Sequence, residues 1–375
     1  MTMHSWMSLK RYQNLRMDLF AKRTISSLAH LGSKAFEAIG GEVVQTVAFV
    51  FESIPSDEPG VFIRLVDVKD VEAKRRHLSE AARNRDSAIR FETPIRRMLE
   101  MPESILAYQA SQAVENAFAN GIPLGDLGEA RQGAATGCNE RFVRMWWEIG
   151  SAGFMTDASS IEEALSSGKK WFPFNKGGSF RKWYGNNDCV IAFDQDSFDE
   201  LVLMGNHLPS RNFYFKPSIT WSKIASGSLS MRMKPKGHVF SDAGMCIFGD
   251  EGKLKLLQGF LNSSSVDPFA HIVSPTLHFE KGQVALYPVL DTGEQATDII
   301  KYVDRNIELT TRDWDAFEVS WDFKWHPLRP RFGQSETLIE NVFADWEAEC
   351  LMHFGEVKNN EEELNRIFAK IYDME

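Results

Sequence analysis

The run from Val43 to Phe51 constrains the fold more than any other stretch of this chain. It reads Val-Val-Gln-Thr-Val-Ala-Phe-Val-Phe, and nearly every residue in it is β-branched or aromatic. Such runs are typical of strands buried inside a sheet. After a turn rich in Pro, Asp and Gly, residues 61–68 read as another strand. Because only a short turn joins the two, the pattern predicts an antiparallel pair.

The residues around this pair extend the expected sheet. Residues 8–23 have helical spacing, with an apolar face and a basic face that includes Arg16. Residues 24–31 read as a short strand, and residues 69–120 are helical in character. Five glycines between Gly121 and Gly137 mark a boundary. Beyond it, short aromatic segments predict mixed α/β structure, and residues 336–354 and 361–372 return to two helices.

Charge is distributed unevenly along the 375 residues. The net charge of −10 argues against nucleic acid when taken whole, because phosphate binding depends on Lys and Arg. Residues 169–184, however, hold five basic residues and no acid, and residues 211–240 hold six and again no acid. A basic face on an acidic body is what a DNA-binding enzyme can show.

Several kinds of site are absent from the sequence. There is no GxGxxG, GxxxxGK[ST], GxSxG or HExxH motif, and no two prolines are adjacent. The four cysteines lie far apart without a CxxC pair, so neither a metal site nor a disulfide framework is expected. No run of 18 apolar residues and no signal-peptide pattern occur, and we expect a cytoplasmic protein without a membrane span.

Several stretches of the sequence together point to one family. They are Leu28–Phe51, Arg131–Trp146, Lys170–Asn187, Phe213–Trp221, Leu261–Ser263 with Ser274–Phe279, and Asp313–Phe323. These stretches resemble the PglX-type adenine-specific DNA methyltransferases of phage defence (BREX), which are similar to restriction–modification enzymes. The matches come in family order and span nearly the whole chain; Cys138 departs from the family, which usually has an acid or Asn there.

The resemblance implies an α/β fold in four parts. Residues 1–68 would form the C-terminal part of a Rossmann-like methyltransferase sheet, 69–125 a helical connector, 126–330 a mixed α/β target-recognition domain that binds double-stranded DNA, and 331–375 C-terminal helices. A full-length enzyme would use S-adenosylmethionine and a Pro-Pro tetrapeptide. This sequence has neither motif, so we expect no bound cofactor, no activity alone, and a missing N-terminal part or partner chain. Other phage-defence proteins are further possible partners.

Candidate DNA contacts follow from the basic stretches and the recognition-domain entry. Phosphate contact is the better interpretation for cations beside Gly177-Gly178, because a glycine turn lets backbone approach DNA, whereas Phe172 and Phe174 are expected in the core. For residues 211–236 and 131–141 an ordinary surface or a domain seal is the competing interpretation. Phe36 could stack on an extruded adenine, although a core position is the more frequent role of a phenylalanine. The DNA candidates are Lys176, Arg181, Lys182, Arg211, Lys216, Thr220, Lys223, Arg232, Arg131, Thr136, Asn139 and Arg141.

Two other classes of function remain open. A free-standing, non-enzymatic specificity subunit could use a similar recognition domain, but it has no use for half a methyltransferase sheet in residues 1–68. A carbohydrate- or peptide-binding module could use the same aromatic residues, but it does not explain eleven cations without an acid across the two basic stretches.

Overall fold

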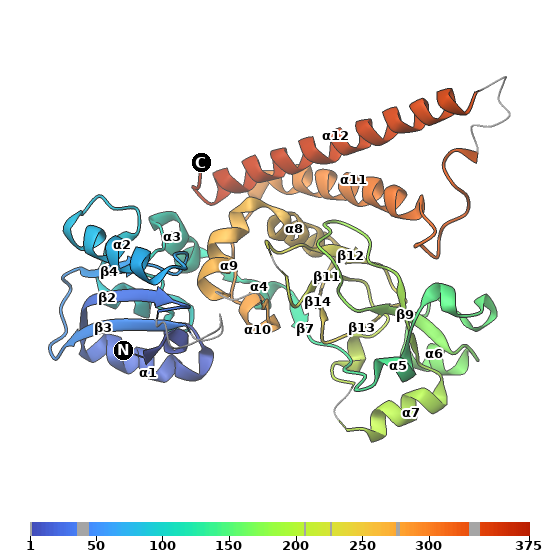
Figure 1. Cartoon of the computed structure of the whole chain (residues 1–375). Helices are drawn as coiled ribbons and strands as arrows, with labels where there is room; N and C mark the ends of the chain where they lie inside the picture. Colours follow the sequence, from blue (N-terminus) through green and yellow to red (C-terminus); the bar gives the residue numbers. More distant parts are fainter. Residues whose placement is uncertain (1, 36–44, 206–207, 226, 275–277, 330–337) are drawn as a thin grey trace. The chain divides into compact units, whose positions relative to one another are not determined.

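A computed structural model describes residues 2–35, 45–205, 208–225, 227–274, 278–329 and 338–375, so the candidate Phe36 lies outside the described residues. The chain divides into two compact units, Met1–Gly121 and Ile122–Glu375. Both combine helices with sheets, which gives a mixed α/β protein (Figure 1). In the described part, no helix is both long and apolar enough to cross a membrane.

The first unit is built on a five-stranded sheet of order β1-β3-β2-β4-β5. The central strand β2 pairs antiparallel with β3 and parallel with β4, and β4 pairs antiparallel with β5. The elements of this unit are β1 (Thr2–Met3), α1 (Gln13–Lys22), β2 (Thr24–Gly32), β3 (Thr46–Glu52), β4 (Gly60–Arg64), α2 (Val71–Arg83), β5 (Arg90–Thr93) and α3 (Gln112–Asn120).

The predicted strands exist, but their predicted pairing is wrong. β3 and β4 are not neighbours; they flank β2 on opposite sides. Residues 53–59 connect them, and seven extended residues reach roughly 23 Å, more than the roughly 10 Å across two strand spacings. The connection is therefore long enough to pass over β2. The helical prediction for 69–120 is also wrong at Arg90–Thr93, which forms the edge strand β5.

Arg16 is fully buried, which corrects its predicted place on the basic outer face of a helix. Its guanidinium donates hydrogen bonds to four backbone carbonyls at 2.8–3.0 Å, those of Trp6, Leu9, Glu103 and Ser104. A planar group with five N–H donors can satisfy several carbonyls that would otherwise be buried without partners. Arg16 thereby ties two segments far apart in sequence to helix α1.

The second unit contains two four-stranded sheets, of order β13-β9-β10-β8 and β12-β11-β14-β7, and a two-stranded sheet of β15 and β6. Its strands are β6 (Ile122–Pro123), β7 (Glu129–Arg131), β8 (Val143–Met145), β9 (Trp171–Asn175), β10 (Cys189–Ala192), β11 (Ser218–Ser222), β12 (Arg232–Lys234), β13 (Val239–Phe240), β14 (Gly244–Phe248) and β15 (Pro288–Val289). Its helices are α4 (Leu124–Leu127), α5 (Asn139–Phe142), α6 (Ile161–Ser166), α7 (Gln195–Leu203), α8 (Glu251–Asn262), α9 (Asp267–Val273), α10 (Lys281–Val284), α11 (Ala296–Asp315) and α12 (Ile339–Ile371).

An aromatic cluster forms the core around β9, β10 and β13. Phe172 and Phe174 are buried in it, which confirms their interpretation as core residues. Phe172 packs edge-on against Phe193 and Phe215, with ring centroids 6.4 and 5.7 Å apart. Edge-to-face contacts of this kind stabilise a core beyond the area they bury.

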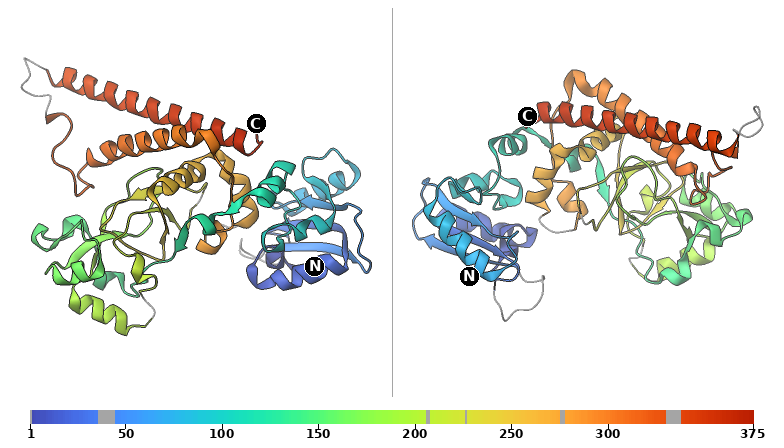
Figure 2. Two further views of the ribbon diagram at one scale, coloured as in Figure 1. Left: turned by 180° about the vertical axis from the view of Figure 1, so that it is seen from behind. Right: turned by 45° about the horizontal axis from the view of Figure 1, so that its top comes forward.

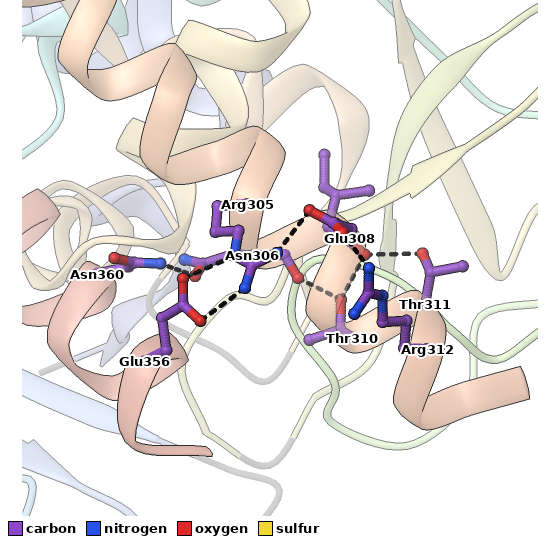
Figure 3. Close-up of polar contacts among 9 residues, drawn as sticks. Arg305, Asn306, Glu308, Thr310, Thr311, Arg312, Glu356 and Asn360 are labelled. Atoms are coloured by element: carbon purple, nitrogen blue, oxygen red, sulfur yellow. Dashed lines mark hydrogen bonds and ion pairs between the residues drawn. The ribbon is translucent and has the colours of Figure 1, made fainter. Parts of the chain in front are cut away.

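Helix α12 is continuous from residue 339 to 371, so the prediction of two separate helices is wrong. It lies beside α11 in every view (Figures 1 and 2). Between the two helices, Arg305 donates to both carboxylate oxygens of Glu356 at 2.6 and 2.8 Å, and the buried Asn360 donates to Asn306 at 2.9 Å (Figure 3). These contacts fall where the sequence indicates a break, around Gly355. They offset the cost of about 1 kcal/mol that a glycine adds inside a helix.

We expect Arg16→Met to destabilise the first unit by about 2 kcal/mol or more, because the carbonyls of Trp6, Glu103 and Ser104 lose their Arg16 donor. The Leu9 carbonyl still accepts from the Tyr12 amide. Hydrogen exchange of residues 2–35 and 90–120, followed by mass spectrometry, measures this locally. The control is Arg11→Met, which removes an exposed guanidinium two residues before Gln13, where the same helix begins. Equal protection in the two variants would contradict the role assigned to Arg16.

Candidate nucleic-acid interface

Several segments of the second unit leave their sheets at the same end. Strands β9 and β13 run parallel, so residues 176–179 and 241–243 follow them at one end. A parallel bridge between Ala134 and Ser241 brings residues 135–139 to that end as well. The two sheets thus gather segments that are more than a hundred residues apart in sequence.

The segment after β11 joins this group. Ser222, the last residue of β11, lies opposite Gly244 at the start of β14, so the chain after Ser222 emerges beside residues 241–243. The Lys223 amide donates to the Ala243 carbonyl at 2.8 Å. We call these four segments the loop cluster: residues 135–139, 176–187, 223–225 and 241–243. Residues 176–187, between β9 and β10, are called the basic loop.

Two glycines shape the start of the basic loop. Gly177 and Gly178 have φ of +84° and +122°, a region that side chains strongly disfavour. A Cβ at Gly177 would also lie 3.0 Å from the Ala243 carbonyl oxygen. Glycine is therefore required here both for the backbone turn and for the close approach of the neighbouring segment.

The tip of the basic loop is fixed by hydrogen bonds to its backbone. The Ser222 hydroxyl donates to the Gly178 carbonyl at 2.9 Å, and the Asn186 side chain donates to the Ser179 carbonyl at 2.9 Å. Backbone bonds fix the next turn, where the Trp183 amide donates to the Met231 carbonyl at 2.8 Å. The loop is held in one conformation by groups from three different segments.

Two cations of strand β12 hold the rest of the loop through hydrogen bonds to its backbone carbonyls. The Arg232 guanidinium donates to the Arg181 carbonyl at 3.1 Å. The Lys234 ammonium donates to the carbonyls of Gly185 and Asn186 at 3.0 and 3.1 Å and to the side-chain oxygen of Asn187. Residues two apart on a strand share a face, so both cations point at the same loop.

Burial changes the acidity of both cations. Removal from water disfavours the charged form and, together with the nearby Arg232, lowers the pKa of Lys234 to about 7. Burial likewise lowers the pKa of Arg232 to about 10, and Cys246 partly opposes that shift. Hydrogen bonds to loop oxygens take the place of the water that these groups lose.

Three other cations of the loop cluster pair with carboxylates at its rim. Arg181 lies 3.3 Å from Asp313 on α11, with its guanidinium over the Trp314 ring. Lys182 lies 3.1 Å from Glu361 on α12. A third pair, Lys223 with Glu280 at 3.0 Å, is also partly exposed. Partly exposed pairs contribute little to stability, so these cations can exchange a carboxylate for another anion at small cost.

Lys176 differs from these three. It is half-buried at the start of the basic loop, and within the described residues no carboxylate lies within ion-pair distance of it. Its charge is therefore the least neutralised in the basic loop.

Comparison with known proteins finds relatives that match nearly the whole sequence. The adenine-specific methyltransferase PglX of Lacticaseibacillus casei (strain Zhang) is 34% identical over 388 residues, a match that covers all of this chain and 32% of PglX. The adenine-specific methyltransferase BrxX of Escherichia coli O9:H4 (strain HS) is 33% identical, over 98% of this chain and 29% of BrxX. This chain is homologous to one part of the PglX and BrxX methyltransferases. It spans about a third of their length.

A solved structure supports the fold. The type IIL restriction–modification enzyme MmeI in complex with DNA matches 97% of this chain and 45% of its own, with a TM-score of 0.50 and 11% identity. At that identity the likeness concerns the fold alone. No family model matches the sequence.

Two of the predicted DNA contacts of this PglX-like chain are corrected by burial. Arg232 is 0% exposed, and its guanidinium donates to the Arg181 carbonyl of the basic loop. Thr220 is also 0% exposed; its hydroxyl donates to the Met245 carbonyl at 2.7 Å and accepts from Asn175 at 2.6 Å. Neither side chain presents any surface to a ligand. Both support the interface from within the sheet.

The structure divides the other predicted residues among three places. The loop cluster contains four of the cations, Lys176, Arg181, Lys182 and Lys223. Lys216 lies just before the opposite end of β11 and lines a cavity of about 820 Å³. Arg131 and Lys216 both lie over the Phe213 ring, at 4.7 and 5.5 Å, and Arg211 lies over Phe198 at 5.7 Å. Thr136 and Asn139 also belong to the loop cluster; Thr136 is buried, and its hydroxyl donates to Asn139 at 2.7 Å. The third place is helix α5, where the exposed Arg141 pairs with Glu200.

Sequence reasoning missed the residues that hold the basic loop. Lys234, Asn186 and Asn187 were not among the candidates, although Asn186-Asn187 lie in the same loop as the Gly177-Gly178 turn that drew attention to it. The signal was the pair of amides itself, because Asn side chains commonly bond to nearby backbone in turns.

The lowered pKa of Lys234 predicts a pH-dependent stability. An unfolded lysine keeps its pKa near 10.5, so above pH 7 the unfolded state binds more protons than the folded state, and stability rises with pH. Lys234→Met removes this dependence. The free energy of unfolding of the unaltered protein, minus that of the variant, should therefore grow by up to about 1.4 kcal/mol per pH unit between pH 7 and 8.5.

Urea unfolding at several pH values measures this difference. Taking the difference cancels the contributions of the buried tyrosines. Burial raises the pKa of the Cys189 and Cys246 thiols, and removal of the nearby Lys234 charge raises it further, so the variant brings neither thiol closer to ionisation. Lys301→Met, at an exposed position on α11, serves as control and should give a constant difference. A constant difference for Lys234→Met would show that its pKa is not lowered.

Proposed function

We propose that this chain carries the DNA-recognition function of a site-specific adenine DNA methyltransferase in bacterial phage defence or restriction–modification. The observation that supports this most strongly is the loop cluster. It offers cations on a backbone fixed by internal hydrogen bonds, in a chain homologous to part of PglX and BrxX. The ligand would be double-stranded DNA, met in the cytoplasm.

The charges of the loop cluster suit a phosphate backbone. Lys176 has the least neutralised charge, and Lys223, Arg181 and Lys182 are tied only by exposed or partly exposed pairs. Phosphate contacts fix the position of a protein on the duplex, and base contacts then decide sequence.

The first unit favours a methyltransferase over a free-standing specificity subunit. We propose that β1–β5 form the end of a methyltransferase sheet whose cofactor-binding part is supplied by another stretch of polypeptide or a partner chain. A separate recognition subunit has no need of such a sheet. S-adenosylmethionine would be the cofactor of the whole enzyme, and other phage-defence proteins are further possible partners.

A carbohydrate- or peptide-binding module is the weaker alternative. Such modules use exposed aromatic faces, but the aromatic side chains of β9 are largely buried in the core. The six-cation stretch at residues 211–240 contributes two cations that hold the basic loop rather than cover a sugar site.

We expect Lys176→Ala to weaken binding to duplex DNA and to lower the slope of log Kd against log salt by about 0.9, the effect of losing one phosphate contact. Fluorescence anisotropy with a labelled mixed-sequence duplex at several salt concentrations measures both. The matched control is Lys301→Ala, an exposed lysine on α11 outside the loop cluster. The same slope in both variants would remove Lys176 from the interface.

We also expect the isolated chain to bind no S-adenosylmethionine, because it has neither a glycine-rich cofactor motif nor a Pro-Pro tetrapeptide. Isothermal calorimetry measures this, with full-length PglX from Lacticaseibacillus casei as the positive control. Micromolar binding of S-adenosylmethionine to this chain would refute the proposal that another stretch of polypeptide or a partner chain supplies the cofactor-binding part.

A further inference from the structure

Phe180 is the most exposed aromatic residue in the basic loop. Its side chain is 63% exposed, whereas the other phenylalanines nearby, Phe172 and Phe174, are buried. Single exposed apolar side chains are common on protein surfaces, so the role of Phe180 must be argued from how the loop holds it and from what surrounds it.

The backbone on both sides of Phe180 is held by side chains. The carbonyls of Gly178 and Ser179 accept bonds from Ser222 and Asn186, and the carbonyl that follows, at Arg181, accepts one from the buried Arg232. Three of the four carbonyls from 178 to 181 are thus tied down, and the tip presents Phe180 in one place. A tip fixed in advance loses little entropy when it binds a ligand.

The surroundings of Phe180 combine charge with apolar surface. Lys176, Arg181 and Lys182 lie within four residues of it in the same loop. On the adjoining segment, Ile224 is 60% exposed beside Lys223. The Ser222 bond to Gly178 joins these two segments directly. The interface therefore has an apolar tip inside a basic rim, and phosphates can meet the rim while the tip meets bases.

We propose that Phe180 is a base-contacting residue that inserts its ring against an unstacked base of duplex DNA. Proteins that kink or open a duplex use apolar wedges of this kind, and an enzyme that modifies a base must take that base out of the stack. Stacking on the ring would offset part of the cost of unstacking. This inference rests on the proposed DNA-recognition function.

A duplex with one base removed tests the proposal without knowledge of the recognised sequence. The probes are a labelled mixed-sequence duplex and the same duplex with a single central abasic site. The abasic duplex has already lost one stacked base, so a wedge enters it at lower cost. The unaltered chain should bind the abasic duplex more tightly than the intact one.

Phe180→Ala should remove that preference and weaken binding to the abasic duplex roughly five- to one-hundred-fold, the range for loss of one stacked aromatic. Phe180→Trp should keep the preference. The salt slope should be unchanged in both, because no phosphate contact is lost. Phe354→Ala, which removes a phenylalanine 70% exposed on α12, is the matched control and should bind like the unaltered chain.

The outcomes separate this proposal from the proposed function. If the unaltered chain binds neither duplex, the DNA-recognition function fails and the role of Phe180 falls with it. If the chain binds and Phe180→Ala keeps the same abasic preference, only the role of Phe180 is overturned. A changed salt slope with an unchanged preference would also overturn it, because Phe180 would then serve only to place the cations.

Discussion

The hydrogen bonds of the buried cations on β12 are the interaction on which the loop cluster of the second unit depends. Moving an ammonium and a guanidinium out of water costs several kcal/mol each, and in the part of the chain that the structure describes neither cation forms an ion pair with a carboxylate. Instead, backbone carbonyls and an amide oxygen of the basic loop accept the N–H bonds of Arg232 and Lys234. The cost is recovered only when the loop is in its native position. The two side chains therefore couple the conformation of an exposed loop to the integrity of the sheet.

This coupling explains why cations with similar sequence surroundings have different roles. Arg232 and Lys223 both belong to the acid-free stretch 211–240, and composition alone assigns both to DNA. Strand β12 is only three residues long, too short for the sequence to show which alternate face is buried. The structure places Lys223 past the end of β11, at the rim, and Arg232 under the loop. The same limit explains Thr220, which sits inside the neighbouring strand.

Local patterns predicted elements better than they predicted partners. The runs at 24–31, 43–51 and 61–68 all overlap strands, because they are rich in β-branched, aromatic and other apolar residues that suit a strand. The pairing of β3 and β4 with β2 depends on contacts between distant residues, which no local pattern contains. The prediction of two separate helices within residues 339–371 fails for the same reason, because the Arg305 and Asn306 side chains that contact the expected break lie on another helix. For the site, the Gly177-Gly178 turn pointed to the right loop. Most of the side chains that hold this loop lie on other strands, at Ser222, Arg232 and Lys234.

Carboxylates at the rim of the loop cluster partly neutralise its cations and so lower its attraction for phosphates in general. Asp313, Glu361 and Glu280 each stand beside a cation that could otherwise hold a phosphate. A phosphate must displace a carboxylate at these positions, so counting cations overstates the attraction of the surface for DNA of any sequence. Weaker attraction to phosphates leaves a larger share of the binding free energy to contacts with bases. On the proposed function, an acidic protein with a net charge of −10 would recognise DNA by the shape and chemistry of one loop cluster rather than by a general excess of positive charge.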